Sequence, residues 1–272
     1  MKLLTLCKRS KEVHKYDFGA LLVIGGSKVY SGSPALNALA ALRSGVDIVE
    51  VAAPKRSADI IATFSPDLIT YPLNGDYFSP KHLKEIFKIV KNKTAVVIGG
   101  GMGRKDQSFK AVQMFLRKID LPCVIDADGI YAVAKKKSIL KKNFILTPHS
   151  YEFYILSGEK VEKDLNKRKE QVKEVSNKLE AVILLKGHID IISDGERTYL
   201  NKTGTPYLTK GGTGDTLAGI IGSLLAQGID PIQAACFGAY VNGKAGELAA
   251  KKYKEGLLAS DLIDKIPKVI NL

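Results

Sequence analysis

Short apolar runs of strand length alternate with helix-length stretches along almost the whole chain of 272 residues. Because the apolar residues occupy both faces of most expected strands, the pattern predicts a mainly parallel sheet covered by helices on both sides, an α/β fold. The expected strands are 20–24, 48–53, 68–71, 95–98, 123–126, 144–147, 181–185, 189–193 and 197–200. The expected helices are 34–43, 54–62, 80–91, 107–118, 151–156, 165–179, 216–226, 231–251 and 260–266.

One hairpin interrupts this alternation. Asp194-Gly195 separates two strand-like runs, a combination that favours a tight turn between antiparallel strands. No Pro/Ser-rich linker, shift in composition or internal repeat divides the sequence. Residues 1–272 are therefore expected to form a single domain.

Charge and cysteine content limit the partners and the compartment. The net charge of +13 favours an acidic partner, such as nucleic acid, a membrane surface or a phosphorylated small molecule. Nucleic acid is not expected, because the lysine runs lack interleaved aromatic residues. No stretch approaches the ~20 apolar residues of a membrane span, and the apolar run 3–7 is too short for a signal segment. Cys7, Cys123 and Cys236 form no CxxC pair, so we expect a soluble cytoplasmic protein without a disulfide framework or zinc site.

A glycine-rich loop followed by a carboxylate is the strongest functional signal. The segment is Gly211-Gly212-Thr213-Gly214-Asp215, and a long apolar run follows it. Glycine lets the backbone approach a ligand closely, and the N-terminus of a helix attracts an anion, so the loop predicts a phosphate site. A carboxylate beside a bound phosphoryl group suits a base for phosphoryl transfer. The alternative, an aspartate that only complements the helix dipole, is less favoured beside so many glycines.

Other glycine-bearing loops follow the ends of expected strands. In open α/β sheets, ligands sit beyond the carboxyl ends of the strands, so these loops predict an extended binding region along one edge. Any single glycine there could instead serve a tight turn. The loops contain Gly25-Gly26-Ser27, Gly99-Gly100-Gly101, Asp126-Ala127-Asp128-Gly129, Thr147-Pro148-His149 and Lys186-Gly187.

Spacing excludes two common nucleotide motifs. The segment 98–104 follows a strand and precedes a helix, but Arg104 stands where the dinucleotide motif G-x-G-x-x-G requires its last glycine. The loop at Gly25-Gly26 has the same defect. The P-loop pattern G-x-x-x-x-G-K-[ST] does not occur in the sequence. Neither a Rossmann nor a P-loop nucleotide site is therefore expected.

Several polar residues at strand ends have two open interpretations. His149, presented by the rigid Pro148, could contact a substrate or could be a structural histidine satisfied by a neighbouring carbonyl; taken alone, the structural role is favoured. Lys186 could reach nucleotide phosphates or be a surface charge. Asp126 and Asp128 could bind Mg²⁺ through water or cap the following helix.

Taken in order, these segments resemble the ADP-dependent NAD(P)H-hydrate dehydratases, a branch of the ribokinase-like superfamily. The resemblance begins at His14-Lys15, continues almost to residue 272, and rests on the order and spacing of six segments. These are GALLVIGGSKVYSGSPALNALAALRSG, VVIGGGMGR, VIDADG, ILTPHSYEF, VILLKG and NKTGTPYLTKGGTGDTLAG. The fold that it implies is a ribokinase-like three-layer α/β/α sandwich with a mainly parallel sheet.

The resemblance also implies a hydro-lyase reaction. Water would be removed from the S form of hydrated NADH or NADPH, coupled to cleavage of ADP to AMP and phosphate. Asp215 matches the family's aspartate and would take the proton from the substrate hydroxyl, which then accepts a phosphoryl group and becomes a good leaving group. Mg²⁺ is expected to arrive with the nucleotide, and no metal site made by the protein itself is expected.

Two sets of binding residues follow from the same resemblance. The ADP site is expected to comprise Lys186, Gly187, His188, Ile189, Asp190, Gly211, Gly212, Thr213 and Gly214. The hydrated dinucleotide is expected to contact Ser33, Gly103, His149 and Asp215. A homo-oligomer, such as a tetramer, is also implied, with the Gly/Ala-rich stretch 234–250 as a candidate contact face.

Some positions depart from the family's pattern. Ser33 stands where Ala is usual, and Gly100 replaces a Pro. Tyr16 occupies a position where Gly is expected, and His188 and Ile189 differ from the usual residues after Lys-Gly. None of these changes removes a charge from the expected chemistry, but they bear on how the substrate fits.

Two other functions would use the same residues. A small-alcohol kinase of the hydroxyethylthiazole or hydroxymethylpyrimidine type would also need Asp215 but would release a phosphorylated product. His149, in its TPHxxE arrangement, favours a dinucleotide substrate instead. A nucleotide sensor without turnover would gain nothing from a base beside the phosphate. The dehydratase is therefore the leading hypothesis, with NADH hydrate and NADPH hydrate both open as substrates.

Overall fold

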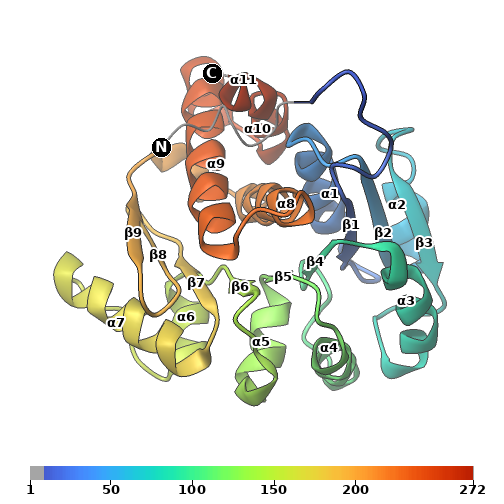
Figure 1. Ribbon diagram of the computed structural model, residues 1–272, viewed down its shortest axis with the longest axis horizontal. Helices are drawn as coiled ribbons and strands as arrows, with labels where there is room; N and C mark the ends of the chain where they lie inside the picture. Colours follow the sequence, from blue (N-terminus) through green and yellow to red (C-terminus); the bar gives the residue numbers. More distant parts are fainter. Residues whose placement is uncertain (1–8, 272) are drawn as a thin grey trace.

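The computed structural model describes residues 9–271, so Cys7 and the apolar run 3–7 lie outside the described residues. Its nine strands form one sheet in the order β3-β2-β1-β4-β5-β6-β7-β8-β9 (Figure 1). Strands β1 to β7 run parallel to one another, and β8 and β9 are added antiparallel at the β7 edge. The strands are β1 (Ala20–Ile24), β2 (Ile48–Pro54), β3 (Ile69–Leu73), β4 (Ala95–Ile98), β5 (Cys123–Ile125), β6 (Phe144–Leu146), β7 (Val182–Leu185), β8 (Asp190–Ser193) and β9 (Thr198–Asn201).

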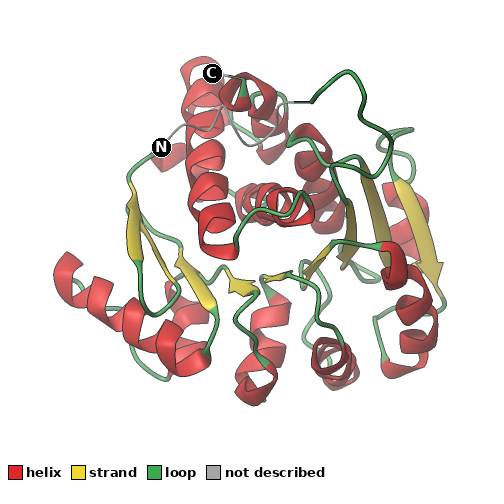
Figure 2. Cartoon of the chain, viewed as in Figure 1, coloured by secondary structure: helices red, strands yellow, loops and turns green. Residues whose placement is uncertain are grey.

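Helices cover both faces of the sheet, as Figure 2 shows. On one side lie α1 (Gly32–Arg43), α2 (Lys55–Ile61), α8 (Thr213–Ala226), α9 (Pro231–Tyr253), α10 (Ala259–Ile263) and α11 (Ile266–Ile270). On the other lie α3 (Leu83–Ile89), α4 (Asp106–Lys118), α5 (Asp128–Ala134), α6 (Ser150–Ser157) and α7 (Leu165–Leu179). The predicted three-layer α/β/α architecture is therefore confirmed.

Side chains alternate between the two faces of each strand, so each strand contributes to two separate hydrophobic cores. Leu21 and Val23 of β1 pack under α1 and α8, whereas Leu22 and Ile24 face the layer of α3 to α7. Successive side chains of a strand point to opposite faces, so an entirely apolar strand supplies both cores at once. All five residues of β1 are buried, which is why this run has no polar alternation in the sequence.

The predicted bounds of β1, β4 and α7 agree with the structure, whereas two of the predicted helices are divided into shorter elements. The stretch 260–266 is divided into α10 and α11, and Pro267 lies in the first turn of α11, a position that suits proline. The stretch 80–91 contains α3 between two 3₁₀ turns, Pro80–His82 and Val90–Asn92. A helix after Asp128 was implied without bounds, and it is α5.

The Gly/Ala-rich face of α9 does not face outward. Ala234, Ala239 and Ala245 are 0–2% exposed and belong to the core shared with α8, α10 and α11. The prediction that stretch 234–250 contacts another subunit is therefore wrong, because small side chains here let helices of the same chain approach closely. Among the helices of residues 9–271, none combines the length and the apolarity that crossing a bilayer would require.

The order of the strands reverses between β1 and β4. From β1 the chain proceeds outward to β2 and β3 and then crosses back to β4 on the other side of β1. The helix after β1 and the helix after β4 cover opposite faces of the sheet. At this point the loops meet, because the Gly26 N–H donates to the Gly100 carbonyl at 2.9 Å. In sheets of this kind, ligands bind beyond the strand ends at such a reversal.

Candidate functional site

The glycine loop continues directly into the first turn of α8. Gly212 has φ +96°, and a Cβ there would lie 2.7 Å from Leu36 Cδ1, so the position requires glycine on both counts. The Thr213 hydroxyl donates to the carbonyls of Leu208 and Lys210, which fixes the turn. The helix therefore begins at Thr213 instead of residue 216. No side chain of the described residues caps it, and the Thr213 amide donates to the Lys210 carbonyl at 3.5 Å, so the following amides of the first turn are the ones that can meet a ligand.

Two further glycines bring α8 close to the sheet and to α1. A Cβ on Gly219 would lie 2.2 Å from the Asn37 carbonyl oxygen, and one on Gly222 would lie 2.3 Å from Val97 Cγ2. Any larger residue would push the helix away from α1 or from β4. The close approach places the N-terminus of α8 beside the reversal between β1 and β4.

Asp215 is held by two side chains of α1. The Ser33 hydroxyl donates a hydrogen bond to Asp215 Oδ1, and Asn37 Nδ2 donates to the Asp215 carbonyl oxygen at 2.8 Å. Residues four apart on a helix share a face, which is why both reach the same residue. Burial, together with the Asp126 carboxylate, raises the pKa of Asp215 to about 6. A base with this pKa is ionised near neutral pH and still able to accept a proton.

Lys186, at the end of β7, faces the glycine loop. Its Nζ lies 3.1 Å from Asp126 Oδ1 and 3.9 Å from Glu152 Oε2, and a Cβ on Gly214 would lie 3.3 Å from it. Burial alone would lower the pKa of Lys186, but the surrounding carboxylates outweigh burial and raise it. The lysine therefore stays an ammonium. With 22% of its side chain exposed, it is not the surface charge of the alternative interpretation.

His149 caps helix α6. Its Nδ1 accepts hydrogen bonds from the amides of Tyr151 and Glu152 at 3.1 and 3.3 Å, and the Glu152 carboxylate accepts from the His149 amide at 2.9 Å. This reciprocal arrangement places the proton of a neutral ring on Nε2. A structural role is present, but the ring bonds amides and not the carbonyl that the sequence suggested. The ring is still 52% exposed and can meet a ligand.

Gly103 lies in the loop after β4, with φ +77°. Its amide donates to Asp128 Oδ2 at 2.8 Å, while Arg104 Nε reaches Asp128 Oδ1 at 3.1 Å. The Arg104 guanidinium also lies over the Tyr131 ring, 3.8 Å from its centre. Asp128 therefore organises the Gly103 loop.

The structure decides one of the two interpretations of Asp126 and Asp128, and Mg²⁺ binding through water stays a prediction. No side chain among the described residues caps α5, so the capping interpretation is wrong. Asp126 Oδ1 accepts from the Thr147 hydroxyl at 2.7 Å and pairs with Lys186. Within residues 9–271, no three His, Cys, Asp or Glu side chains are grouped as metal ligands. A cation here would have to be held largely by phosphate and water oxygens, which suits Mg²⁺.

The segment from Lys186 to Asp190 is only partly directed at Asp215. Asp190 accepts from the Gly187 amide at 3.0 Å and from Asn201 Nδ2 at 2.9 Å, so it holds the turn between β7 and β8. His188 is exposed. The structure thus brings Ser33, Lys186, Gly214 and Asp215 together, and joins His149 to them through Glu152. No recorded contact of the described residues joins His188, Ile189 or Gly211 to this group.

Two members of the site lay outside the predicted site residues. Glu152 is 5% exposed and links His149 to Lys186, and burial raises its pKa although the Lys186 ammonium opposes the rise. The second member is Asn37, whose amide donates to the Asp215 carbonyl oxygen. It is the one polar side chain on the buried face of an otherwise Ala- and Leu-rich helix, four residues after Ser33, and that pattern is the signal that could have identified it.

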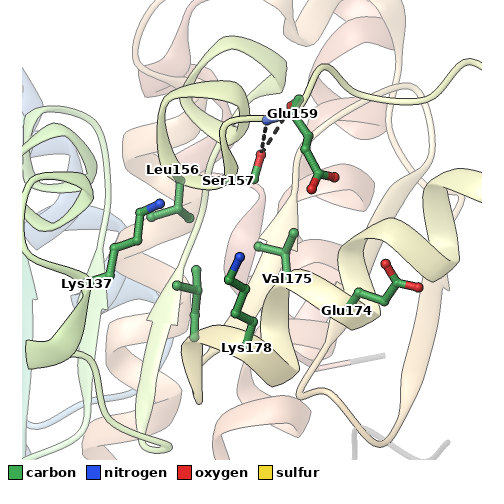
Figure 3. A pocket seen from close by; sticks show the side chains of 8 residues that line it. Lys137, Leu156, Ser157, Glu159, Glu174, Val175 and Lys178 are labelled. Carbon is green, nitrogen blue, oxygen red and sulfur yellow. Dashed lines mark hydrogen bonds between the residues drawn. The ribbon is translucent and has the colours of Figure 1, made fainter.

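A pocket of about 180 Å³ lies elsewhere, where α6 meets α7 (Figure 3). Both basic and acidic side chains line it, among them Lys137, Lys178 and Glu174. The Ser157 hydroxyl in this pocket is satisfied by the carbonyls of Phe153 and Glu159. None of the predicted site residues lines it.

Comparisons with known proteins agree with this geometry. A family model described as NAD(P)H-hydrate dehydratase matches residues 21–268. The chain is 42% identical, over 97% of its length, to the bifunctional NAD(P)H-hydrate repair enzyme Nnr of Hyperthermus butylicus, of which it covers 50%. It spans about half the length of several such curated relatives. It is also 36% identical to the ADP-dependent (S)-NAD(P)H-hydrate dehydratase of Cenarchaeum symbiosum, over 96% of this chain and 92% of that relative.

Solved structures give the same result for the fold. The ADP/ATP-dependent NAD(P)H-hydrate dehydratase of Bacillus subtilis, co-crystallised with ATP and Mg²⁺, superposes with a TM-score of 0.82 at 30% identity, covering 98% of this chain and 94% of that one. A ribokinase-like superfamily protein of Enterococcus faecalis superposes with a TM-score of 0.85 at 23% identity, covering 97% and 91%. The predicted ribokinase-like fold is therefore confirmed.

Proposed function

The chain belongs to the NAD(P)H-hydrate dehydratase family, and on this basis we propose that it removes water from the S form of hydrated NADH or NADPH. ADP would be the co-substrate, and AMP and phosphate would be released. One observation carries the proposal: the Asp215 carboxyl, with a pKa of about 6, lies in the first turn of α8 beside amides and an ammonium that suit a phosphoryl group.

The first step would be transfer of a phosphoryl group to the substrate. Asp215, ionised above pH 6, takes the proton of the ring hydroxyl as the hydroxyl oxygen attacks the terminal phosphorus of ADP, and AMP leaves. The amides at Gly212 to Gly214 and the Lys186 ammonium stabilise the charge on the transferred group. Mg²⁺ bound to the nucleotide would neutralise phosphate charge during this step.

The second step would be loss of phosphate. The C–O bond breaks as the ring nitrogen donates its lone pair, phosphate leaves with both electrons of that bond, and a proton from the neighbouring ring carbon is released. The double bond of the dihydronicotinamide is then restored. The enzyme's contribution here would be the amides at the start of α8 and the Lys186 ammonium, which stabilise the charge of the leaving phosphate.

The residues divide between the two substrates. Lys186, Gly187, His188, Ile189, Asp190 and Gly211 to Gly214 would contact ADP, and Ser33, Gly103, His149 and Asp215 would contact the hydrated dinucleotide. The contacts among Ser33, Asp215 and Lys186 support the adjacency of these two sites. That all nine strands of residues 9–271 form one sheet supports a single domain. The homo-oligomer stays a prediction, and the Gly/Ala-rich face of α9 is no longer its expected contact surface.

The test is a direct assay. The protein is incubated with S-hydrated NADH or NADPH, Mg²⁺ and either ADP or ATP, and the absorbance of the dihydronicotinamide is followed while AMP and phosphate are quantified. We expect absorbance and AMP to rise together, and neither to rise without nucleotide. No recovery with either nucleotide would overturn the proposal. Formation of a phosphorylated hydroxyethylthiazole or hydroxymethylpyrimidine in its place would support the kinase.

A further inference from the structure

We propose that Ser33 is a positioning residue for Asp215: its hydroxyl occupies Oδ1 and leaves Oδ2 as the atom that receives the substrate proton, and glycine at position 100 exists to give that hydroxyl room. The inference rests on the proposed function, because it assigns an atom to the proposed proton transfer.

The first support is how Asp215 is held. Ser33 donates to the carboxylate and Asn37 to the main-chain carbonyl of the same residue, so α1 fixes both ends of the aspartate. Ser33 must keep its proton to make this bond, so one of the two acceptor positions of Oδ1 is already occupied. Among the described residues, no side chain makes a direct hydrogen bond to Oδ2, although the nearby Asn37 amide, like Ser33, lowers the pKa of the Asp215 carboxyl. The substrate hydroxyl would therefore transfer its proton to Oδ2, forming a neutral carboxyl while Ser33 keeps its own proton.

The second support is the three-glycine loop after β4. Gly99 and Gly101 have φ values of +127° and +66°, so their backbone conformation already calls for glycine. Gly100 is not in the positive-φ region, and its backbone would accept alanine. A Cβ there, however, would lie 2.1 Å from Ser33 Oγ and 3.1 Å from Asp215 Oδ1. The space that this glycine leaves empty is thus the space that the hydroxyl and the carboxylate use.

The chemistry gives the contact a consequence. A hydroxyl that donates to a carboxylate stabilises the anion and so opposes the effect of burial. Ser33 lowers the pKa of Asp215 in this way, together with the Lys186 ammonium and the Asn37 amide, whereas burial and the Asp126 carboxylate raise it. Without the hydroxyl, a smaller fraction of Asp215 would be ionised at any pH near neutrality, and the freed Oδ1 could rotate into the place of Oδ2.

The decisive experiment is a titration of the Ser33→Ala variant. We expect the acid limb of kcat/KM to move upward by about one pH unit, the size expected for a hydrogen bond to a charged group. The midpoint of the Asp215 carboxyl titration, measured by ¹³C NMR in the nucleotide-free protein where no turnover occurs, should rise by the same amount. The matched control is Ser157→Ala, the same change at a satisfied hydroxyl in the pocket of Figure 3, and both titrations should stay unchanged there.

The second variant tests the role of position 100. Gly100→Ala should reproduce the pH shift of Ser33→Ala, because the new methyl group displaces the hydroxyl. The double variant should lose no more than a few-fold in kcat/KM beyond either single variant, since both changes remove the same hydrogen bond. Fully additive losses, or an unchanged Asp215 titration in folded Ser33→Ala, would overturn the inference. If the NMR shift appears in a protein that never dehydrates the hydrate, the proposed function fails and the Ser33 contact stands.

Discussion

Two groups of buried charged side chains in this molecule differ in how evenly negative and positive charges are matched. Away from the site, Glu50 of β2 pairs with Lys93 at 3.0 Å, and their side chains are only 11% and 5% exposed. Lys93 precedes β4, at the end of the strand opposite to the glycine loop. In the candidate site, three carboxylates, those of Asp126, Glu152 and Asp215, share the single ammonium of Lys186.

The difference separates a structural contact from a reactive one. One carboxylate and one ammonium balance each other's charge, and the Tyr71 side chain also interacts with the Glu50 carboxylate, so the Glu50–Lys93 pair has no net charge. Three carboxylates around one ammonium leave two negative charges without a buried partner. The imbalance is consistent with the raised pKa of Asp215 and of Glu152, for each of which burial is the largest cause. A site of this kind takes up protons or cations, and incoming substrates can supply both.

The largest effect is expected from Asp215→Asn. The amide keeps the shape and can still accept from Ser33, but it cannot take a proton, so kcat should fall by about 10²–10⁴-fold. ADP binding should change by no more than a few fold, because the amides of α8 and Lys186 remain. Single-turnover assays and calorimetric titration with ADP measure the two quantities. Normal rates in this variant would show that Asp215 is not the base.

Breaking the Glu50–Lys93 pair should lower the stability of the protein and leave kcat unchanged. Lys93→Met leaves the Glu50 carboxylate buried without its ammonium, so the free energy of unfolding should fall by about 3–5 kcal/mol. Adding Glu50→Gln to this variant should restore part of the loss, since no charge is then left alone. Urea unfolding measures the stability, and kcat at 25 °C should equal that of the parent. A large loss of kcat in the folded single variant would contradict the distinction between the two groups.

The sequence predicts the sheet well because each strand can be recognised from its own short apolar run. The runs at β1 and β4 are apolar throughout, and a buried parallel strand requires nothing else. The same locality placed Lys186 at a strand end and Asp215 at the start of a helix. By contrast, the Ala- and Gly-rich stretch of α9 misled, since small residues suit close packing within a chain as well as between chains.

The contacts that tune the site are not local. Ser33 and Asp215 are 182 positions apart, so no spacing rule could connect the hydroxyl to the carboxylate. The fit of Gly100 to that hydroxyl likewise depends on three separate segments. His149 shows a different limit, because its ring caps a helix through Nδ1 and also remains exposed for a ligand, whereas the sequence alone suggests one role or the other.

Loss of the base should also stabilise the protein, the opposite of the result for Lys93. Asp has a pKa near 3.9 in an unfolded chain, whereas folding raises that of Asp215 to about 6. Between these values the folded state holds the extra proton, so stability falls as pH rises from about 4 to 6 and stays lower above. Asp215→Asn should therefore gain up to about 3 kcal/mol at pH 8 and almost nothing at pH 4. Unfolding curves at both pH values measure this, and a gain that is independent of pH would contradict the cause.

The smallest effect is expected in the wild-type pH profile. Because Asp215 must be ionised to act, kcat/KM should fall about tenfold per pH unit below a midpoint near 6 and be flat just above it. The Glu50→Gln variant is the control, since its pair lies outside the site and should leave the midpoint unchanged. A midpoint near 4 would mean that the carboxylate excess does not raise the pKa of the base. The contrast between a balanced pair and an unbalanced cluster would then have no bearing on catalysis.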